Sequence, residues 1–436
     1  MRALLVVLVI ALLGSSVAMG EDNAAVSYSL PNGLKVSLRP VEDAKSTCIV
    51  TLFSVGLVDD PAGKSGLSHL AEHIYNVSAS GKTAARTVDK IAEKYPLGWN
   101  AQTGCDFTIF ATIFPAEQME AEFTESASRM KELAIGDAEI ETEKARILEE
   151  TANMFERIPW LAAQNLAAER LRPSPNGGRK GGTDAELTAL STEDIKNFIE
   201  SYYKPNNAVI VISGALDVKV ARELIEKLYT EIPTGKPLPE RPKAVAPPEK
   251  FFETLAVDVA AVAPNTPSEV CLAFPAPDFR DRLFPAFVVL ASRLQTRAYS
   301  KLKSAPGRQA ISYAPFDNPQ FLFISLPLEA EQTPEEAVEA LDKFVAETVA
   351  KRLHPFDVFS TKSNYGFQMG FMEMPDEMIA ASPYWVALSL AWKERGSLDP
   401  AAMGKLVEAV TQEALDEAAK TIFAPDRRTA VVVITQ

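Results

Sequence analysis

Two of the three histidines in this 436-residue chain lie within the segment that runs from Gly66 to His73. The segment reads Gly-Leu-Ser-His-Leu-Ala-Glu-His, so His69 and His73 are four positions apart and Glu72 directly precedes the second histidine. Residues four positions apart lie on the same face of a helix, and both imidazoles can therefore reach one metal ion. The spacing predicts a helical metal site with a carboxylate beside it, in the reverse order of the H-E-x-x-H zinc motif.

A third protein ligand has to come from another segment, because hydrolytic zinc is held by three protein groups and one water. The segment 138–155 has a helical pattern and supplies the candidate acids Glu139, Glu141, Glu143, Glu149 and Glu150. Glu143 and Glu150 are seven positions apart and share a stripe with apolar residues, whereas Glu149 is rotated by about 100° from Glu150. The stripe is either an inward face that coordinates something or a solvated acidic face, and the spacing leaves both readings open.

The composition is that of an ordinary globular protein, with 47% hydrophobic and 23% charged residues. The net charge of −14 argues against nucleic acid as a partner, because phosphate backbones are bound by clusters of Lys and Arg. Residues 1–20 predict a signal peptide, since Arg2 is followed by an apolar run and then by small residues. The run is shorter than the about 20 residues that a membrane span needs. We therefore expect an exported protein that is not membrane-embedded. Asn76-Val77-Ser78 is a formal glycosylation sequon, but a glycan there would obstruct the metal motif, so we expect a bacterial periplasm rather than the outside of the cell.

The three cysteines and the third histidine are weaker candidates for chemistry. Cys48, Cys105 and Cys271 are odd in number and lie in apolar, strand-like contexts. We expect them to be buried small hydrophobic residues, with at least one thiol unpaired within the chain. His354 has no partner histidine nearby, and we expect it at the surface or at a helix end.

Alternating and periodic apolar patterns predict a mixture of strands and helices. The predicted strands form a hairpin over 27–38 and cover 48–55, 107–114 and 208–213. Besides the segment with the histidines, the predicted helices cover 84–94, 116–133, 138–155, 161–171 and 192–202. Residues 232–250 contain six prolines and no periodic apolar pattern, so we expect a linker between domains there.

One local pattern occurs in both halves of the chain. A helix, an aromatic residue, a proline and a buried strand follow one another over 192–213 and again over 411–434. The recurrence predicts a divergent duplication of one α+β domain. We expect a first domain over 24–231 that carries the metal motif, and a homologous second domain over 251–436 that lacks it.

The chain resembles a known family, the inverzincin metallopeptidases of the pitrilysin and insulin-degrading enzyme type, and in particular their short, processing-peptidase-like branch. The resemblance rests on the segments Gly66 to His73, Asn100 to Thr103, Glu143 to Glu150 and Tyr203 to Asn207. It extends over essentially the whole mature chain. It implies an α+β fold of two homologous domains, each a mainly antiparallel sheet packed with helices, which face each other as a clam-shell.

The resemblance also implies an activity, that of a zinc-dependent endopeptidase or oligopeptidase with one Zn²⁺ per chain. The implied zinc ligands are His69, His73 and Glu150. Glu72 would be the general base on a zinc-bound water, and Glu143 would be a supporting acid. An extended peptide substrate would add as a strand beside Asn100 and Ala101.

The second domain departs from the family pattern. In the family it supplies an arginine and a tyrosine that hold the substrate carbonyl. Here Tyr313 matches the tyrosine, while Arg308 and Lys303 are both candidates for the other residue and neither has the expected spacing. A homologous partner chain in a homodimer or heterodimer could supply the pair. Three alternatives follow: a peptidase active alone, the catalytic half of a dimer, or a non-catalytic binding or assembly subunit.

Overall fold

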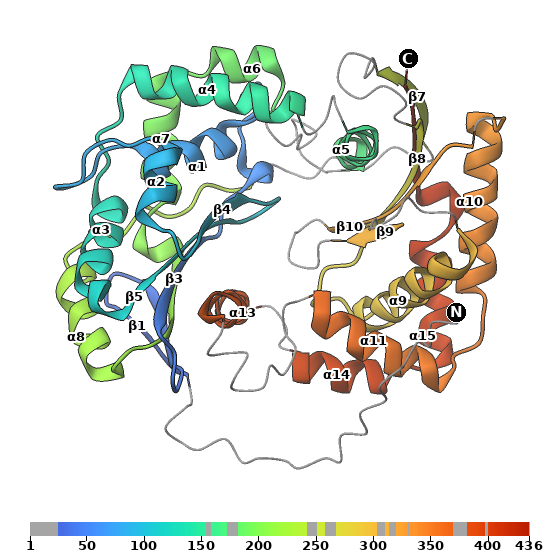
Figure 1. Ribbon diagram of the computed structural model, residues 1–436. Helices are drawn as coiled ribbons and strands as arrows, with labels where there is room; N and C mark the ends of the chain where they lie inside the picture. The colour runs from blue at the N-terminus through green and yellow to red at the C-terminus, as the bar shows by residue number, and fades with distance from the viewer. Residues whose placement is uncertain are drawn as a thin grey trace, which may run out of the picture.

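The computed structural model has a mixed α+β architecture. It describes residues 25–153, 158–171, 182–241, 251–257, 267–302, 310–313, 320–329, 331–368, 382–396 and 400–435. The predicted signal peptide and residues 242–250 of the predicted linker lie outside these ranges. Figure 1 shows two units of sheet and helices that face each other. None of the helices in the described ranges has the length and apolar character that a membrane crossing requires.

The first sheet has six strands in the described residues, in the order β1-β2-β6-β3-β5-β4. Their bounds are β1 Val26–Ser29, β2 Lys35–Pro40, β3 Ser46–Phe53, β4 Trp99–Thr103, β5 Thr108–Pro115 and β6 Ala208–Gly214. β1 and β2 form the predicted hairpin, and β2 is parallel to β6 while the other neighbours are antiparallel. The central strand β6 is buried along its whole length, in keeping with its run of Val and Ile. β4 occupies one edge of this sheet.

The second sheet repeats this plan with five described strands in the order β7-β11-β8-β10-β9. Their bounds are β7 Phe251–Val257, β8 Glu269–Ala276, β9 Ile311–Tyr313, β10 Gln320–Pro327 and β11 Thr429–Thr435. β7 is parallel to β11 and the other pairs are antiparallel, so the strands correspond one to one to β2, β6, β3, β5 and β4. The predicted fold class of two alike, mainly antiparallel α+β units is confirmed.

The recurring sequence pattern is also one recurring structural unit. Helix α7 (Thr192–Tyr202) leads through a short 3-10 turn over Pro205–Asn207 into β6. Helix α15 (Gln412–Ile422) leads through Pro425–Arg427 into β11 in the same way. In each case a proline is the first residue of the turn and fixes the backbone after the helix has ended.

Helices cover the outer face of the first sheet and enclose its core. They are α1 Leu67–Val77, α2 Val88–Lys94, α3 Met119–Lys131, α4 Asp137–Thr151, α6 Asp184–Ala189, α7 and α8 Val218–Tyr229. The helix predicted over 84–94 begins only at Val88, because the Thr87 hydroxyl caps it by accepting the Lys90 amide proton. Helix α8 was not predicted, although its buried residues Ala221, Ile225 and Tyr229 recur at helical spacing.

A second set of helices covers the outer face of the second sheet. They are α9 Phe284–Lys301, α10 Pro334–Val349, α11 Pro355–Gln368, α14 Pro400–Glu408 and α15. In this set α9, α10 and α15 contact the strands, and α11 and α14 pack on α9. α9 follows β8 as α1 follows β3, but it contains no histidine. The position equivalent to the metal motif is therefore filled by an ordinary core helix.

The two units exchange one helix each across the space between them (Figure 1). Helix α5 (Pro159–Leu171) packs on the second sheet, where Ala163 and Ala167 contact its inner face. Helix α13 (Pro383–Arg395) packs on β3 and β6 of the first sheet through Ala387 and Ala391. These alanines are fully buried, and small side chains let a helix approach a sheet closely. The domain bounds at 231 and 251 stay a prediction. Helix α5 precedes these bounds but packs on the second sheet, and α13 follows them but packs on the first sheet.

Candidate metal centre

The start of helix α1 is fixed by a buried carboxylate. Gly66 caps the helix in the left-handed region, at φ 87°, which favours glycine. The Asp60 carboxylate accepts the amide protons of Gly66 and Ser68, each at 2.8 Å. Burial raises the pKa of Asp60 to about 7, and the bonds from Ser68 and Gly66 oppose that rise. The segment that carries the histidines therefore begins at a well-defined position.

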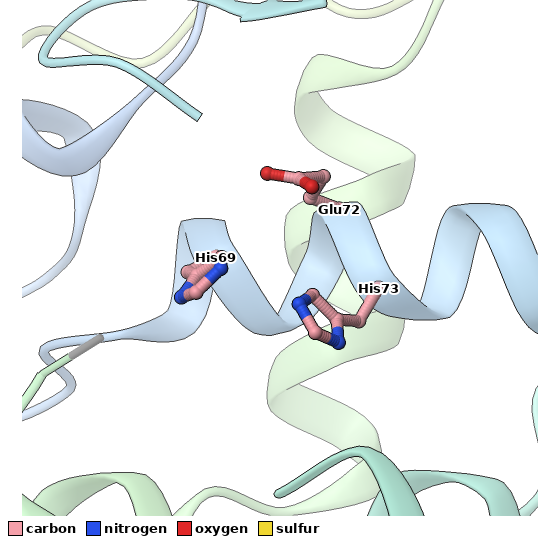
Figure 2. A group of neighbouring side chains, drawn as sticks. All are labelled: His69, Glu72 and His73. Atoms are coloured by element: carbon pink, nitrogen blue, oxygen red, sulfur yellow. The ribbon is translucent and has the colours of Figure 1, made fainter. Parts of the chain in front are cut away.

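The two histidines lie on one face of α1, as their spacing predicts (Figure 2). Their ring centroids are 4.8 Å apart and the ring planes are almost perpendicular. The possible ligand atoms of His69, Glu72 and His73 all lie within 4.8 Å of one another. This cluster of two imidazoles and a carboxylate is one that can hold a metal ion.

Glu150 on α4 approaches the same two rings. Its Oε1 lies 4.0 Å from Nε2 of His69, and its Oε2 lies 3.7 Å from Nε2 of His73. Ligand atoms around a tetrahedral zinc ion are about 3.3 to 3.5 Å apart, given metal-ligand bonds of about 2.0 to 2.2 Å. The observed separations are slightly longer than that, so the donor set fits zinc with a small inward movement of one carboxylate.

Glu143 orients one of these imidazoles. Its Oε2 lies 2.9 Å from Nδ1 of His73, and its side chain is almost completely buried. A carboxylate that accepts from Nδ1 leaves Nε2 of the ring with its lone pair, which is the form that binds a metal. Arg146 contacts the same oxygen of Glu143, with Nε 3.3 Å from Oε2. Glu149, by contrast, is exposed, so the stripe through Glu143 and Glu150 faces inward.

Glu72 is held from the edge strand of the sheet. Its carboxylate is buried and accepts a hydrogen bond of 2.6 Å from the Thr103 hydroxyl at the end of β4. The bond ties α1 to β4 and fixes the carboxylate beside the histidines. Sequence reasoning assigned no role to Thr103, although the residue stands within the Asn-Ala-x-Thr segment that carried the resemblance.

A cavity of about 280 Å³ opens beside these groups. The residues that line it are His69, Glu72, His73, Asn76, Val77, Val88, Trp99, Asn100, Ala101, Gln102, Thr103, Glu143, Arg146 and Glu150. Asn100 and Ala101, which the resemblance implied as the substrate edge, lie on the edge strand β4 and line this cavity. Trp99, Val77 and Val88 give part of the lining an apolar character.

The second unit contributes a residue to this edge that sequence reasoning missed. Tyr384 on the exchanged helix α13 places its hydroxyl 3.4 Å from Nδ2 of Asn100. Burial raises the pKa of Tyr384, and the bond from Asn100 opposes the rise. The periodicity of a helix shows which residues it buries but not which sheet covers them, so this contact had no signal in the sequence.

The other candidates for chemistry lie away from the cavity or outside the described residues. Tyr313 ends the edge strand β9 of the second sheet, and its side chain is not among those described. Arg308 and Lys303 lie outside the described residues. His354 is exposed, as predicted, and its Nδ1 accepts the Phe356 amide proton at the start of α11. The three cysteines are buried and none of them is in a disulfide, which also agrees with the prediction.

Two family models match successive parts of the chain. Residues 36–178 match the Insulinase family, also called Peptidase family M16. Residues 189–365 match the Peptidase M16 inactive domain. The first match contains all the residues of the candidate metal centre, namely His69, Glu72, His73, Glu143 and Glu150.

Individual relatives match about half of this chain. The chain is 25% identical over 228 residues to the zinc protease PqqE of Helicobacter pylori, which covers 50% of this chain and 50% of that protein. It is 23% identical over 232 residues to the probable zinc protease PqqL of Escherichia coli, covering 50% and 24%. It is 22% identical over 204 residues to a probable mitochondrial-processing peptidase subunit beta of Arabidopsis thaliana, covering 47% and 38%. These matches span half or less of the relatives' own lengths.

Solved structures share the fold over almost the whole chain. A protease from Helicobacter pylori superposes with a TM-score of 0.78 at 20% identity, and the match covers 94% of this chain and 99% of that one. The periplasmic protease PqqL of Escherichia coli superposes with a TM-score of 0.71 at 17% identity, covering 96% and 48%. These structures show that the fold is shared. The two family models, which match residues 36–178 and 189–365, establish that the chain belongs to the M16, or pitrilysin, family of metallopeptidases.

Proposed function

We propose that the protein is a zinc-dependent endopeptidase or oligopeptidase that uses one Zn²⁺ per chain. The observation that carries this proposal is the position of Glu150 within 4.0 Å of both histidine Nε2 atoms, with Glu72 beside them. His69, His73 and Glu150 would hold the ion. Two neutral imidazoles and one carboxylate leave a divalent ion with a net positive charge, which suits the oxyanion of peptide hydrolysis.

The protein groups around the ion have separate tasks in this mechanism. When bound, zinc supplies a Lewis acid that lowers the pKa of a water molecule and polarises a peptide carbonyl. Glu72 takes up the proton of the attacking water and passes it to the leaving amine. The Thr103 hydroxyl holds one oxygen of Glu72, so the carboxylate is aimed before the substrate arrives. Glu143 keeps the His73 ring in the tautomer and orientation that a ligand needs.

The substrate would be an extended peptide that lies along β4. β4 is the outermost described strand of its sheet, and Asn100 and Ala101 line the cavity beside the histidines. Backbone hydrogen bonds to a strand edge give affinity without requiring a particular sequence. Trp99 and the neighbouring valines would favour an apolar side chain in the cavity.

The compartment and the partner are proposed from the relatives. PqqL of Escherichia coli is described as periplasmic, which supports export with a leader at residues 1–20. Other relatives are named as subunits, namely the beta subunit of the mitochondrial-processing peptidase and core protein I of ubiquinol-cytochrome-c reductase. These names support the second candidate, in which the chain is the catalytic half of a homodimer or heterodimer. The intact donor set favours a catalytic role over a purely structural one.

Zinc analysis of three proteins tests the proposal. Wild type and Glu149→Gln should each bind about one zinc per chain, while Glu150→Gln should bind more weakly because it loses a charged ligand. The two variants make the same chemical change one residue apart, and Glu149 is exposed. Zinc-loaded wild type should cleave unstructured peptides, alone or with a homologous chain, and a chelator should stop cleavage. Wild type with less than about a tenth of an equivalent of zinc would contradict the proposal.

A further inference from the structure

We propose that Arg395, which the second half of the chain supplies, is a positioning residue for Glu72 in the first half. The proposal rests on the function proposed above, because it gives Glu72 the role of general base. Arg395 is the last residue of the exchanged helix α13 and does not line the cavity. It would act through the turn that joins β4 to β5.

Arg395 is firmly held at that turn. Its guanidinium forms an ion pair with the Asp106 carboxylate and donates to the Asp106 backbone oxygen at 3.0 Å. The guanidinium carbon Cζ of Arg395 also lies 5.7 Å from the ring centroid of Phe107 and 5.7 Å from that of Trp392. Both charged side chains are largely buried, with 12% of Arg395 and 5% of Asp106 exposed. Removing the charge of Arg395 would therefore leave the buried Asp106 carboxylate with a weaker partner, Arg241, whose Nη1 is 3.7 Å from Oδ2 of Asp106.

The turn connects Asp106 to the catalytic carboxylate over a short distance. Thr103, which donates to Glu72 at 2.6 Å, ends β4 three residues before Asp106. The Gly104 amide donates to the Phe107 oxygen at 2.9 Å and closes the turn between them. A shift of Asp106 in this closed turn moves the Thr103 hydroxyl and hence the oxygen of Glu72 that it holds.

The turn is also confined on its other side. The Leu57 and Val58 amides donate to the oxygens of Gly104 and Cys105 at 3.1 and 2.9 Å. The two loops approach so closely that a Cβ on Gly56 would lie 2.4 Å from the Gly104 oxygen. The turn therefore lies between a fixed loop of the first half and Arg395 from the second half. Docking of α13 thus sets the position of the base.

The competing explanation is that Arg395 only anchors α13. The adjacent residue, Glu394, provides a matched control because it anchors the same end of the same helix. Its carboxylate accepts from the hydroxyls of Ser27 and Ser37 at 2.6 and 2.7 Å. Those serines lie on β1 and β2, at the opposite edge of the sheet from β4. Loss of Glu394 would loosen the helix without reaching Thr103.

The test compares Arg395→Gln, Arg395→Lys and Glu394→Gln in the full chain. We expect Arg395→Gln to lower kcat by about 10- to 100-fold, the loss that a misplaced catalytic group produces, with KM changed less than about threefold. Zinc content should stay unchanged. Arg395→Lys, which keeps a charge for Asp106, should recover most of the loss, and Glu394→Gln should keep kcat within about twofold.

A double-mutant comparison tests the path itself. Thr103→Val should lower kcat to a similar extent, and adding Arg395→Gln to it should lower kcat little further, because both changes act on one bond. Independent losses that multiply in the double variant would overturn the proposal. So would a kcat for Arg395→Gln equal to that of Glu394→Gln.

Amide hydrogen exchange of residues 103–107 provides a readout that does not depend on activity. Exchange there should become faster in Arg395→Gln and stay unchanged in Glu394→Gln. Unchanged exchange in Arg395→Gln would refute the structural path. If zinc-loaded wild type cleaves no peptide while exchange changes as expected, the proposed function has failed and the coupling between Arg395 and the turn stands.

Discussion

Replacing Glu143 by Gln should weaken zinc binding by about tenfold. The substitution keeps the shape of the side chain and one oxygen that can accept from Nδ1 of His73, so the bond of 2.9 Å is retained but loses its charge. A hydrogen bond to a charged group contributes about 1.5 to 3 kcal/mol, and a neutral one about 0.5 to 1.5 kcal/mol. The difference of about 1 to 1.5 kcal/mol corresponds to about tenfold in Kd. Because only 4% of the Glu143 side chain is exposed, water can replace little of the lost interaction.

The assay is a competition between the protein and a chromophoric chelator for zinc at pH 7. Glu149→Gln is the control, because it removes the same charge from an exposed position on the same helix. Its Kd should stay within about twofold of wild type, since exposed charges contribute little. A Glu143→Gln protein whose Kd equals that of the control would show that Glu143 does not support His73.

Three further predictions concern stability. Because the pKa of Asp60 is raised to about 7 in the folded protein, the folded state keeps a proton that the unfolded state has released. The free energy of unfolding relative to Asp60→Asn should therefore fall as pH rises from 5 to 7, by at most about 1.4 kcal/mol per pH unit in urea titrations; a flat difference would contradict this. Gly56→Ala should lower the free energy of unfolding by about 1 to 3 kcal/mol, because its Cβ meets the Gly104 backbone; an unchanged denaturant midpoint would refute the close approach. Ala391 lies at a fully buried contact of α13 with the first sheet. Ala391→Leu should also lower the free energy of unfolding by about 1 to 3 kcal/mol, and a free energy of unfolding equal to that of wild type would argue against the packing of α13 on the first sheet.

The local parts of the site could be predicted from the sequence because they depend on helical spacing. The positions of His69 and His73 follow from the geometry of one helix, whatever the rest of the chain does. Helical spacing placed Glu143 and Glu150 on one stripe of α4 and so reduced the number of candidate metal ligands. Spacing could not decide whether this stripe faced inward. The resemblance to a family pointed to Glu150, and the structure places this residue beside both rings.

The parts that could not be predicted depend on contacts between distant segments. Helix α5 is the next named helix after α4, and its apolar pattern predicts a buried face without indicating that this face packs on the second sheet. The same holds for α13, which brings Tyr384 to Asn100 and Arg395 to Asp106. A duplicated fold offers two similar sheets to such a helix, and only tertiary packing distinguishes them.

The role of Glu72 is tested most directly by the rate at which zinc-loaded Glu72→Gln hydrolyses an unstructured peptide. We predict that the variant binds about one zinc per chain and hydrolyses the peptide at least about 10²-fold more slowly than zinc-loaded wild type, because it lacks the general base. Hydrolysis by the zinc-loaded variant at the wild-type rate would contradict the mechanism.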